Sequence, residues 1–352
     1  MRIHQDFTGG NIAVKEEKEG GFVLGNELRD TTEDWFYWAF CIEGAEGREL
    51  TFEFGANRLG YFGPAVSHDL VHWHWLGSVC GDSFTYRFAQ DESRVYFAHH
   101  MLYHPDRFLE FAKRHGLAAE ELCRGYRGSS VPCVKFGSGG KSIILTARHH
   151  ACESTGNYVL EGVLEELLER PIADTRVFCV PFVDYEGVIR GDQGKSRAPH
   201  DHNRDYSAAD GFIYPECRAI RDYAEKYGCC FGFDFHSPWH RGGENDSVFI
   251  VQNRIDRLDR LNRFGELFER AVTAESVKYE HKNDYPPETG WNRGGSQFSL
   301  FMTGRRENDI AFTLETAYFG TEENRVSGEG LTEMGRCFAR ALREYMNTGG
   351  AV

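Results

Sequence analysis

Three apolar runs of the chain end in side chains that bind metal ions or transfer protons. His150 and Glu153 follow the first run, His236 ends the second, and Glu315 ends the third. Imidazole nitrogen and carboxylate oxygen are both ligands of Zn²⁺, and a His-x-x-Glu spacing lets His150 and Glu153 face one point. With His236 as a third ligand, the fourth position of a tetrahedral zinc ion stays open to water. That is the layout of a catalytic rather than a structural site.

The chemistry that such a site predicts is hydrolysis by water. Bound zinc lowers the pKa of a water ligand toward about 7, so that hydroxide is available near neutrality. A carboxylate outside the metal shell can accept the proton, and Glu315 is the natural candidate. Each group also has a plainer explanation. A His-x-x-Glu spacing arises by chance in many chains, Glu315 could cap a helix, and His149 could replace His150 as a ligand.

A polar segment between these groups, Asp201-His202-Asn203-Arg204, could bind an anion. The guanidinium of Arg204 offers a planar, bidentate fork for a carboxylate, and the amide of Asn203 adds one donor. Asp201 could accept a hydrogen bond from the outer nitrogen of a zinc-bound histidine and so orient that ligand. The plainer alternative is a solvated surface loop.

The elements that must position these groups alternate between strands and helices from residue 105 onward. Expected strands span residues 142–147, 176–183, 229–235, 248–252 and 310–314, and expected helices span 105–115, 159–168, 212–227, 255–274 and 331–345. This alternation indicates an α/β fold with a mixed, mainly parallel sheet flanked by helices on both faces. In such a sheet the functional groups gather at the carboxyl ends of the strands.

The first ninety residues have a different texture, with short aromatic runs separated by glycine-bearing turns. Expected strands span residues 35–42, 49–54, 71–76 and 84–88. Several short strands without a helical period predict a small antiparallel β-sandwich. We therefore expect two domains, an N-terminal β-sandwich over residues 1–95 and a catalytic α/β domain over residues 96–352.

Composition excludes some classes of function. The 352 residues include 40 Lys and Arg against 54 Asp and Glu, a formal net charge of −14, which disfavours binding to nucleic acid or to an anionic membrane. No stretch approaches the roughly 20 apolar residues of a membrane span, and the first residues lack an apolar signal core. None of the ten cysteines forms a Cys-x-x-Cys pair. We expect a reduced, cytoplasmic protein without a nucleic-acid or membrane partner.

Four segments, in their order along the chain, resemble the signature of the M14 zinc carboxypeptidases. They are Ala147-Arg148-His149-His150-Ala151-Cys152-Glu153, Asp201-His202-Asn203-Arg204, Asp234-Phe235-His236-Ser237 and Thr313-Leu314-Glu315-Thr316. Their order and spacing are more specific than any one segment alone. The chain resembles most the cytosolic carboxypeptidase branch, whose members carry an N-terminal β-sandwich before a zinc carboxypeptidase-like domain.

This resemblance implies one Zn²⁺ per chain, bound by His150, Glu153 and His236. It also implies that Asn203 and Arg204 hold the terminal carboxylate of the substrate. The substrate would be a peptide or an amino-acid conjugate with a free C-terminal carboxylate.

The remaining roles follow from the same resemblance. Asp201 would support the first histidine ligand, and Glu315 would act as general base and then protonate the leaving amine. An arginine ahead of the Asn-Arg pair would polarise the scissile carbonyl. Arg197 fits this role best, with Arg190 and Lys195 as alternatives.

Substrate preference is left open by the sequence. Members of the branch often favour acidic C-termini, which would require a basic group in the pocket for the last side chain; Lys282, Arg293 and Arg305 are candidates. Many members swing a tyrosine over the substrate, and Tyr285 and Tyr318 are candidates for that residue.

The function expected from the sequence is that of a zinc-dependent metallocarboxypeptidase. A deacylase or amidase of N-acyl amino acids or cell-wall peptides on the same scaffold would keep the zinc, Arg204 and Glu315. A catalytically silent binding protein is the second alternative, and the presence of Glu315 and of all three ligands argues against it. The sequence gives no indication of an oligomeric state.

Overall fold

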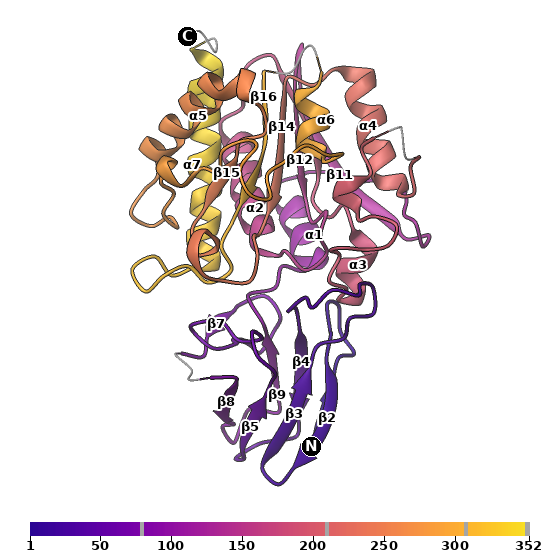
Figure 1. Cartoon of the computed structure of the whole chain (residues 1–352), viewed down its shortest axis with the longest axis vertical. Helices are drawn as coiled ribbons and strands as arrows, with labels where there is room; N and C mark the ends of the chain where they lie inside the picture. The colour runs from indigo at the N-terminus through magenta and orange to yellow at the C-terminus, as the bar shows by residue number, and fades with distance from the viewer. Residues whose placement is uncertain (78–80, 208–210, 306–308, 349–352) are drawn as a thin grey trace.

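A seven-stranded sheet forms the centre of the larger part of the molecule (Figure 1). The computed structural model describes residues 1–77, 81–207, 211–305 and 309–348. The order across the sheet is β10-β11-β13-β12-β14-β16-β15. The strands are β10 (Ala119–Arg124), β11 (Ser130–Ser138), β12 (Lys141–Ala147), β13 (Thr175–Val180), β14 (Phe231–His236), β15 (Phe249–Val251) and β16 (Ile310–Glu315).

The four central strands, β13, β12, β14 and β16, are parallel. β10, β11 and β15 add antiparallel pairs at the two edges. Every residue of β14 and β16 is buried. Strands covered on both faces read as near-continuous apolar runs, which is why the sequence indicated them. The expected mixed, mainly parallel α/β sheet is confirmed.

Helices cover both faces of this sheet. α1, α2, α5 and α7 pack on one face, and α4 and α6 on the other (Figure 1). Ile143 and Leu145 of β12 point to the first face and Ile144 to the second, as the two-residue period of a strand requires. The helices are α1 (Pro105–Arg114), α2 (Thr155–Glu169), α3 (Tyr185–Arg190), α4 (Pro215–Tyr227), α5 (Leu258–Ala271), α6 (Phe298–Thr303) and α7 (Gly328–Asn347), with 3₁₀ turns η1 (His202–Arg204), η2 (Gly243–Asp246), η3 (Ile255–Arg257) and η4 (His281–Asn283).

The N-terminal part is a sandwich of two small sheets, in the orders β1-β4-β9-β6-β7 and β2-β3-β5-β8. Phe40 and Phe97 from the first sheet share one apolar core with Phe22 and Phe52 from the second. β3 and β5 pair in parallel, a departure from the expected antiparallel arrangement, while the other pairs are antiparallel. The strands are β1 (Arg2–His4), β2 (Ala13–Lys18), β3 (Gly21–Gly25), β4 (Ala39–Glu43), β5 (Glu49–Glu53), β6 (Ala65–Ser67), β7 (His74–Trp75), β8 (Ser83–Arg87) and β9 (Arg94–Ala98).

Some strand bounds differ from those expected. Within the expected strand 35–42, the observed strand begins only at Ala39. Within the expected strand 71–76, only His74 and Trp75 form a strand. Trp35 instead packs against Trp239 of the larger part. The β10–β11 hairpin is missing from the expected strands because β10 is largely exposed and carries no apolar run.

The expected domain boundary at residue 95 falls inside β9. Phe97 pairs with Phe40 of β4 and with Val66 of β6, so this strand belongs to the N-terminal sheet as far as Ala98. The division into residues 1–95 and 96–352 stays a prediction, with β9 across its boundary.

Among the described helices, none is both long and apolar enough to cross a membrane.

Candidate active site

The carboxyl ends of three parallel strands bring the candidate ligands together. The loop after β12 carries His150 and Glu153, and β14 ends at His236, which lies opposite Glu315 of β16 in the strand register. The ligand atoms of His150, Glu153 and His236 all lie within 4.8 Å of one another. The fold therefore gathers these groups at the edge where functional groups of parallel sheets are found.

The buried carboxylate of Glu153 is at the centre of this group. Its Oε1 lies 2.9 Å from Nδ1 of His150 and 2.5 Å from Nζ of Lys195. Its Oε2 lies 2.6 Å from Nδ1 of His236 and accepts a hydrogen bond from the Ser237 N–H at 3.2 Å. Burial acts to raise the pKa of Glu153, but the charges of Lys195 and the two histidines hold that pKa well below its usual value.

The outer nitrogens of the two histidines face carboxylates. Nε2 of His236 lies 2.6 Å from Oδ2 of Asp234, and Nε2 of His150 lies 3.6 Å from Oδ1 of Asp201. Carboxylates in this position hold the proton on the outer nitrogen and leave the Nδ1 lone pair for a metal ion. Two imidazole nitrogens and one carboxylate oxygen that face a common point are a fitting donor set for zinc.

His149, the alternative first ligand, is engaged elsewhere. Its Nδ1 lies 2.8 Å from Oδ1 of Asp234, and its Nε2 lies 2.7 Å from the hydroxyl of Tyr206. His149, Asp234 and His236 also lie within ligand distance of one another. Nδ1 of His150 faces the Glu153 carboxylate, whereas the ring nitrogens of His149 face Asp234 and Tyr206, so the geometry favours His150 over His149 as the ligand.

Arg148 fixes the loop that carries His150 and Glu153. Its φ of 61° lies in the left-handed region, which is uncommon for residues other than glycine. The buried guanidinium donates to the Ala151 carbonyl at 2.8 Å and to the side-chain oxygens of Ser154 and Asn157 at 3.1 and 3.2 Å. These bonds stabilise the strand-to-helix turn in the conformation that presents the candidate ligands.

Glu315 is buried beside this group but is not part of it. No described residue donates a hydrogen bond to its Oε2. Burial raises the pKa of Glu315 to about 7, against the positive charge of His236 and with a contribution from the Glu153 carboxylate. A carboxyl group with a pKa near neutrality is suited to accept a proton and to return it.

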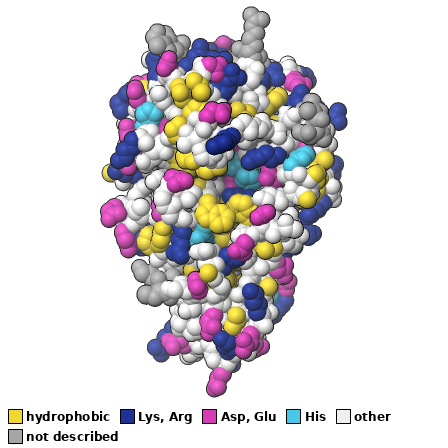
Figure 2. Space-filling view, in the orientation of Figure 1, with side chains coloured by type: hydrophobic (Ala, Val, Ile, Leu, Met, Phe, Trp, Pro, Cys, Tyr) yellow, Lys and Arg dark blue, Asp and Glu magenta, His cyan; other side chains and the backbone are white. Residues whose placement is uncertain are grey.

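A cavity of about 410 Å³ opens over the candidate ligands and Glu315, and Asn203 and Arg204 line it as well. Arg204 is exposed, and its Nη1 donates to the Asn203 carbonyl at 2.9 Å. Figure 2 shows hydrophobic side chains gathered next to histidine and charged side chains near the middle of the face drawn. The other lining residues are Trp35, Lys195, Ser237, Pro238, Trp239, Asn245, Val251, Asn253, Trp291, Asn292, Gln297, Ser299, Leu300 and Thr313.

Arg197, the expected carbonyl-polarising residue, is not among the described residues that line the cavity. Its guanidinium is held by three carboxylates, 3.0 Å from Asp30, 2.7 Å from Asp184 and 3.2 Å from Asp192. Lys195, one of the alternatives, lines the cavity instead. This placement argues against the assignment of Arg197 and favours Lys195.

Tryptophans from three segments line the cavity. Trp35 comes from the N-terminal part and packs against Trp239 with ring centroids 5.0 Å apart, while Trp291 is 54% exposed. Of the two tyrosines considered for covering the substrate, Tyr318 is fully buried and Tyr285 stacks on Trp291 at 4.8 Å. Neither tyrosine belongs to the described lining.

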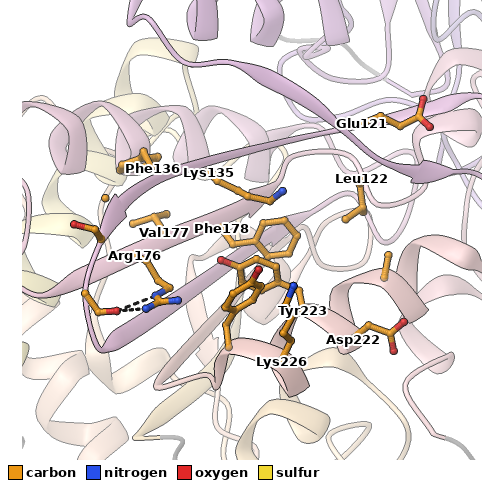
Figure 3. A pocket seen from close by; sticks show the side chains of 15 residues that line it. Glu121, Leu122, Lys135, Phe136, Arg176, Val177, Phe178, Asp222, Tyr223 and Lys226 are labelled. Carbon is orange, nitrogen blue, oxygen red and sulfur yellow. Dashed lines mark hydrogen bonds between the residues drawn. The ribbon is translucent and has the colours of Figure 1, made fainter.

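A second cavity, of about 700 Å³, lies between strands β10, β11 and β13 and helix α4 (Figure 3). Its walls include Phe178 and Tyr223, whose rings stack 3.9 Å apart, and the cations Lys135 and Arg176. Its described lining contains the carboxylates Glu121 and Asp222 but no histidine and no cysteine. The candidate ligands His150, Glu153 and His236 line the smaller cavity instead.

Two contributors to the site have no assigned role in the sequence expectations. Asp234 stands two residues before His236 in one strand, so the two side chains share a face. This two-residue spacing could have identified Asp234 as a partner of His236. Trp35 reaches the cavity from the N-terminal part, and no local pattern indicates this.

No family model matches the chain. An uncharacterised protein of Zymomonas mobilis is 27% identical over 90% of this chain and 88% of that protein. Cytosolic carboxypeptidase 2 of Xenopus tropicalis is 28% identical over 75% of this chain and 30% of that protein. The chain spans half the length, or less, of the cytosolic carboxypeptidases of Caenorhabditis elegans and Xenopus tropicalis that it matches.

Solved structures with the same fold cover nearly the whole chain. A metallo-carboxypeptidase from Burkholderia cenocepacia has a TM-score of 0.81 at 19% identity, with 99% of each chain covered. A metallo-carboxypeptidase from Pseudomonas aeruginosa, in complex with (2-guanidinoethylmercapto)succinic acid, has a TM-score of 0.77 at 20% identity, also with 99% of each chain covered. The fold is that of metallo-carboxypeptidases, and the expected resemblance to their cytosolic branch, a class of hydrolases, is confirmed.

The pairing of Asp234 with His236 generates a testable prediction. Asp234→Asn should weaken the affinity for added Zn²⁺ about 10- to 100-fold, because a carboxylate partner orients a metal-binding imidazole and raises its basicity. The affinity is measured by competition with a chelator. The control is Asp222→Asn, an exposed aspartate of α4, which should bind zinc as the wild type does. Equal zinc affinities for Asp234→Asn and the wild type would contradict this assignment.

Proposed function

We propose that the chain is a zinc-dependent metallocarboxypeptidase that removes the last residue from peptides or amino-acid conjugates with a free C-terminal carboxylate. One observation carries the proposal: a donor set for zinc, a buried carboxylate with a raised pKa, and an Asn-Arg pair line a single cavity. Each is common alone, but hydrolysis at a chain end needs all three together.

His150, Glu153 and His236 are the proposed ligands of one zinc ion. Their converging atoms, and the carboxylates of Asp201 and Asp234 behind the two imidazoles, support this assignment. Zinc, when bound, would polarise the scissile carbonyl and lower the pKa of a water molecule.

Glu315 is the proposed base. Its carboxyl group shares the cavity with the proposed ligands and keeps an oxygen to which no described residue donates. It would accept a proton from the attacking water and then deliver that proton to the leaving amine. The pKa of about 7 that burial gives this group suits both halves of the exchange.

Asn203 and Arg204 are the proposed holders of the terminal carboxylate. Nδ2 of Asn203 lies 3.3 Å from Nε2 of His236, so this pair adjoins the proposed metal site. A carboxylate bound there would hold the end of the substrate chain next to the candidate ligands. Such an anchor would favour cleavage of the last amide bond of the substrate.

Lys195 is the proposed cation for the developing oxyanion. Its ammonium group already lies at the Glu153 carboxylate and lines the cavity. Burial acts to lower the pKa of Lys195, but the Glu153 charge outweighs it and raises that pKa. The group would therefore stay positively charged through the reaction.

A deacylase or amidase acting on N-acyl amino acids would use the same residues, so the substrate distinguishes it. Cleavage of single N-acyl amino acids but not of N-acyl dipeptides would favour that alternative. A silent binding protein is disfavoured because the proposed base and all the proposed ligands are present in one cavity.

Glu315→Gln should lower kcat on N-acylated dipeptides about 10²- to 10⁴-fold and leave the Kd for the dipeptide nearly unchanged, because the amide cannot accept the proton. Hydrolysis is followed by release of the free amino acid, and binding by calorimetry. Glu110→Gln, an exposed site on α1, is the matched control. Wild-type enzyme should leave the same dipeptides uncleaved when their C-terminus is an amide. Full activity of Glu315→Gln would refute its role as base.

Variants of Lys195 and Arg197 should differ in what they change, the first lowering kcat and the second the melting temperature. Lys195→Met should lower kcat about 10²- to 10³-fold at full zinc loading, through loss of a charge that stabilises the oxyanion. Arg197→Lys should lower the melting temperature, because the shorter cation cannot reach all three carboxylates, and should change kcat little. A large loss of kcat in Arg197→Lys at an unchanged melting temperature, with Lys195→Met active, would reverse the assignment.

A further inference from the structure

One part of the cavity, which we name the side-chain pocket, is lined by Val251, Asn253, Gln297, Ser299, Leu300 and Thr313. Its floor is set by β15 and β16, where Val251 pairs with Thr313 in the strand register. Thr313 stands two residues before Glu315 and shares its face of the strand. Helix α6 closes the other side with Ser299 and Leu300, and Thr313 Oγ1 donates to Ser299 Oγ at 3.4 Å.

This side-chain pocket adjoins the Asn-Arg pair. The Phe298 N–H donates to Oδ1 of Asn203 at 3.1 Å, and the Ser296 hydroxyl donates to the Arg204 carbonyl at 2.7 Å. The start of α6 is therefore tied to the two residues proposed to hold the terminal carboxylate. The side chain of a C-terminal residue leaves the same α-carbon as the carboxylate, so a residue held there would have its side chain within reach of the space between α6, β15 and β16.

The described residues give the side-chain pocket no cation of its own. Of the described residues that line the whole cavity, only Lys195 and Arg204 are lysine or arginine, and both have proposed roles elsewhere. The three basic residues considered from the sequence are not in that lining. Lys282 pairs with Glu280 at 3.0 Å, Arg293 donates to a backbone carbonyl, and Arg305 lies over an aromatic ring.

Two amide oxygens make the side-chain pocket less suitable still for an anion. Asn253 donates through Nδ2 to the Ala311 carbonyl at 3.0 Å, which fixes the opposite, oxygen end of its amide. No described residue donates to that Oδ1 or to Oε1 of Gln297, and both atoms are buried. Their lone pairs would repel a carboxylate and would attract an N–H or O–H donor.

We propose that this side-chain pocket favours an uncharged C-terminal residue over aspartate and glutamate. The proposal rests on the proposed carboxypeptidase function and names its substrate class. An uncharged side chain meets the apolar surfaces of Val251 and Leu300, and a donor on it can reach an amide oxygen. A carboxylate would lose its hydration without gaining a counter-charge.

The test compares two substrates that differ only in charge. N-acyl-Gly-Gln and N-acyl-Gly-Glu are nearly isosteric, and N-acyl-Gly-Leu adds an apolar side chain. We expect kcat/KM for the Gln and Leu substrates to exceed that for the Glu substrate at least ~30-fold, because the Glu carboxylate would be buried without a counter-charge. Equal rates, or faster cleavage of the Glu substrate, would overturn the inference.

A binding measurement keeps the inference separate from the proposed function. The Kd of each dipeptide for the zinc-loaded Glu315→Gln variant is measured by calorimetry. Tighter binding of the Gln than of the Glu dipeptide, with no cleavage of either by the wild type, would support the pocket and refute the peptidase. Equal or tighter binding of the Glu dipeptide would refute the pocket, whether or not the wild type cleaves.

A variant should reverse the preference. Leu300→Arg places a cation in the side-chain pocket and should raise the ratio of Glu to Gln cleavage at least ~10-fold. Leu300→Met, of similar volume and without charge, is the matched control and should keep the wild-type ratio. An unchanged ratio in Leu300→Arg, with normal folding and zinc content, would contradict the placement of this pocket.

Discussion

The buried carboxylate of Glu153 is the group on which the rest of the site depends. An ionised carboxylate in a protein interior costs several kcal/mol unless cations pair with it. Lys195, His150 and His236 supply that pairing within 2.9 Å. A divalent cation would be a stronger partner for the same oxygens, which both imidazoles already face through their Nδ1 atoms. The same arrangement of side chains therefore pairs the buried Glu153 charge and forms a donor set for a metal ion. Arg148 and the strand ends hold that arrangement in place.

The N-terminal sandwich takes part in this arrangement instead of standing apart from it. Asp30 accepts hydrogen bonds from the backbone N–H groups of Gln193 and Gly194 at 2.9 and 2.7 Å and also pairs with Arg197. These contacts fix the segment that carries Lys195 into the cavity. The Lys195 ammonium also lies over the indole ring of Trp35, 4.7 Å from the ring centroid. The cation proposed to stabilise the oxyanion is thus positioned by residues from both parts of the chain.

The sequence could predict features that depend on neighbouring residues, and it could not predict those that depend on the packing of distant segments. The parallel strands were evident because burial on both faces makes them apolar throughout, whereas the exposed β10 had no such pattern. His236 and Glu315 stood at strand ends, so their meeting followed from topology. The choice between Lys195 and Arg197 did not follow, because Arg197 is held by three carboxylates, one of them Asp30 of the N-terminal part. That Lys282, Arg293 and Arg305 are not among the described residues of the cavity lining likewise depended on how segments far apart in the chain pack.

Metal content tests the central claim most directly. The wild-type protein and the variants His150→Ala, His236→Ala and Glu315→Gln would be purified, equilibrated with Zn²⁺, desalted and analysed for zinc by elemental analysis. The account predicts about one zinc per chain in the wild type and in Glu315→Gln, and loss of zinc in both histidine variants, because Glu315 is a base and not a ligand. Zinc retained by both histidine variants would contradict the account.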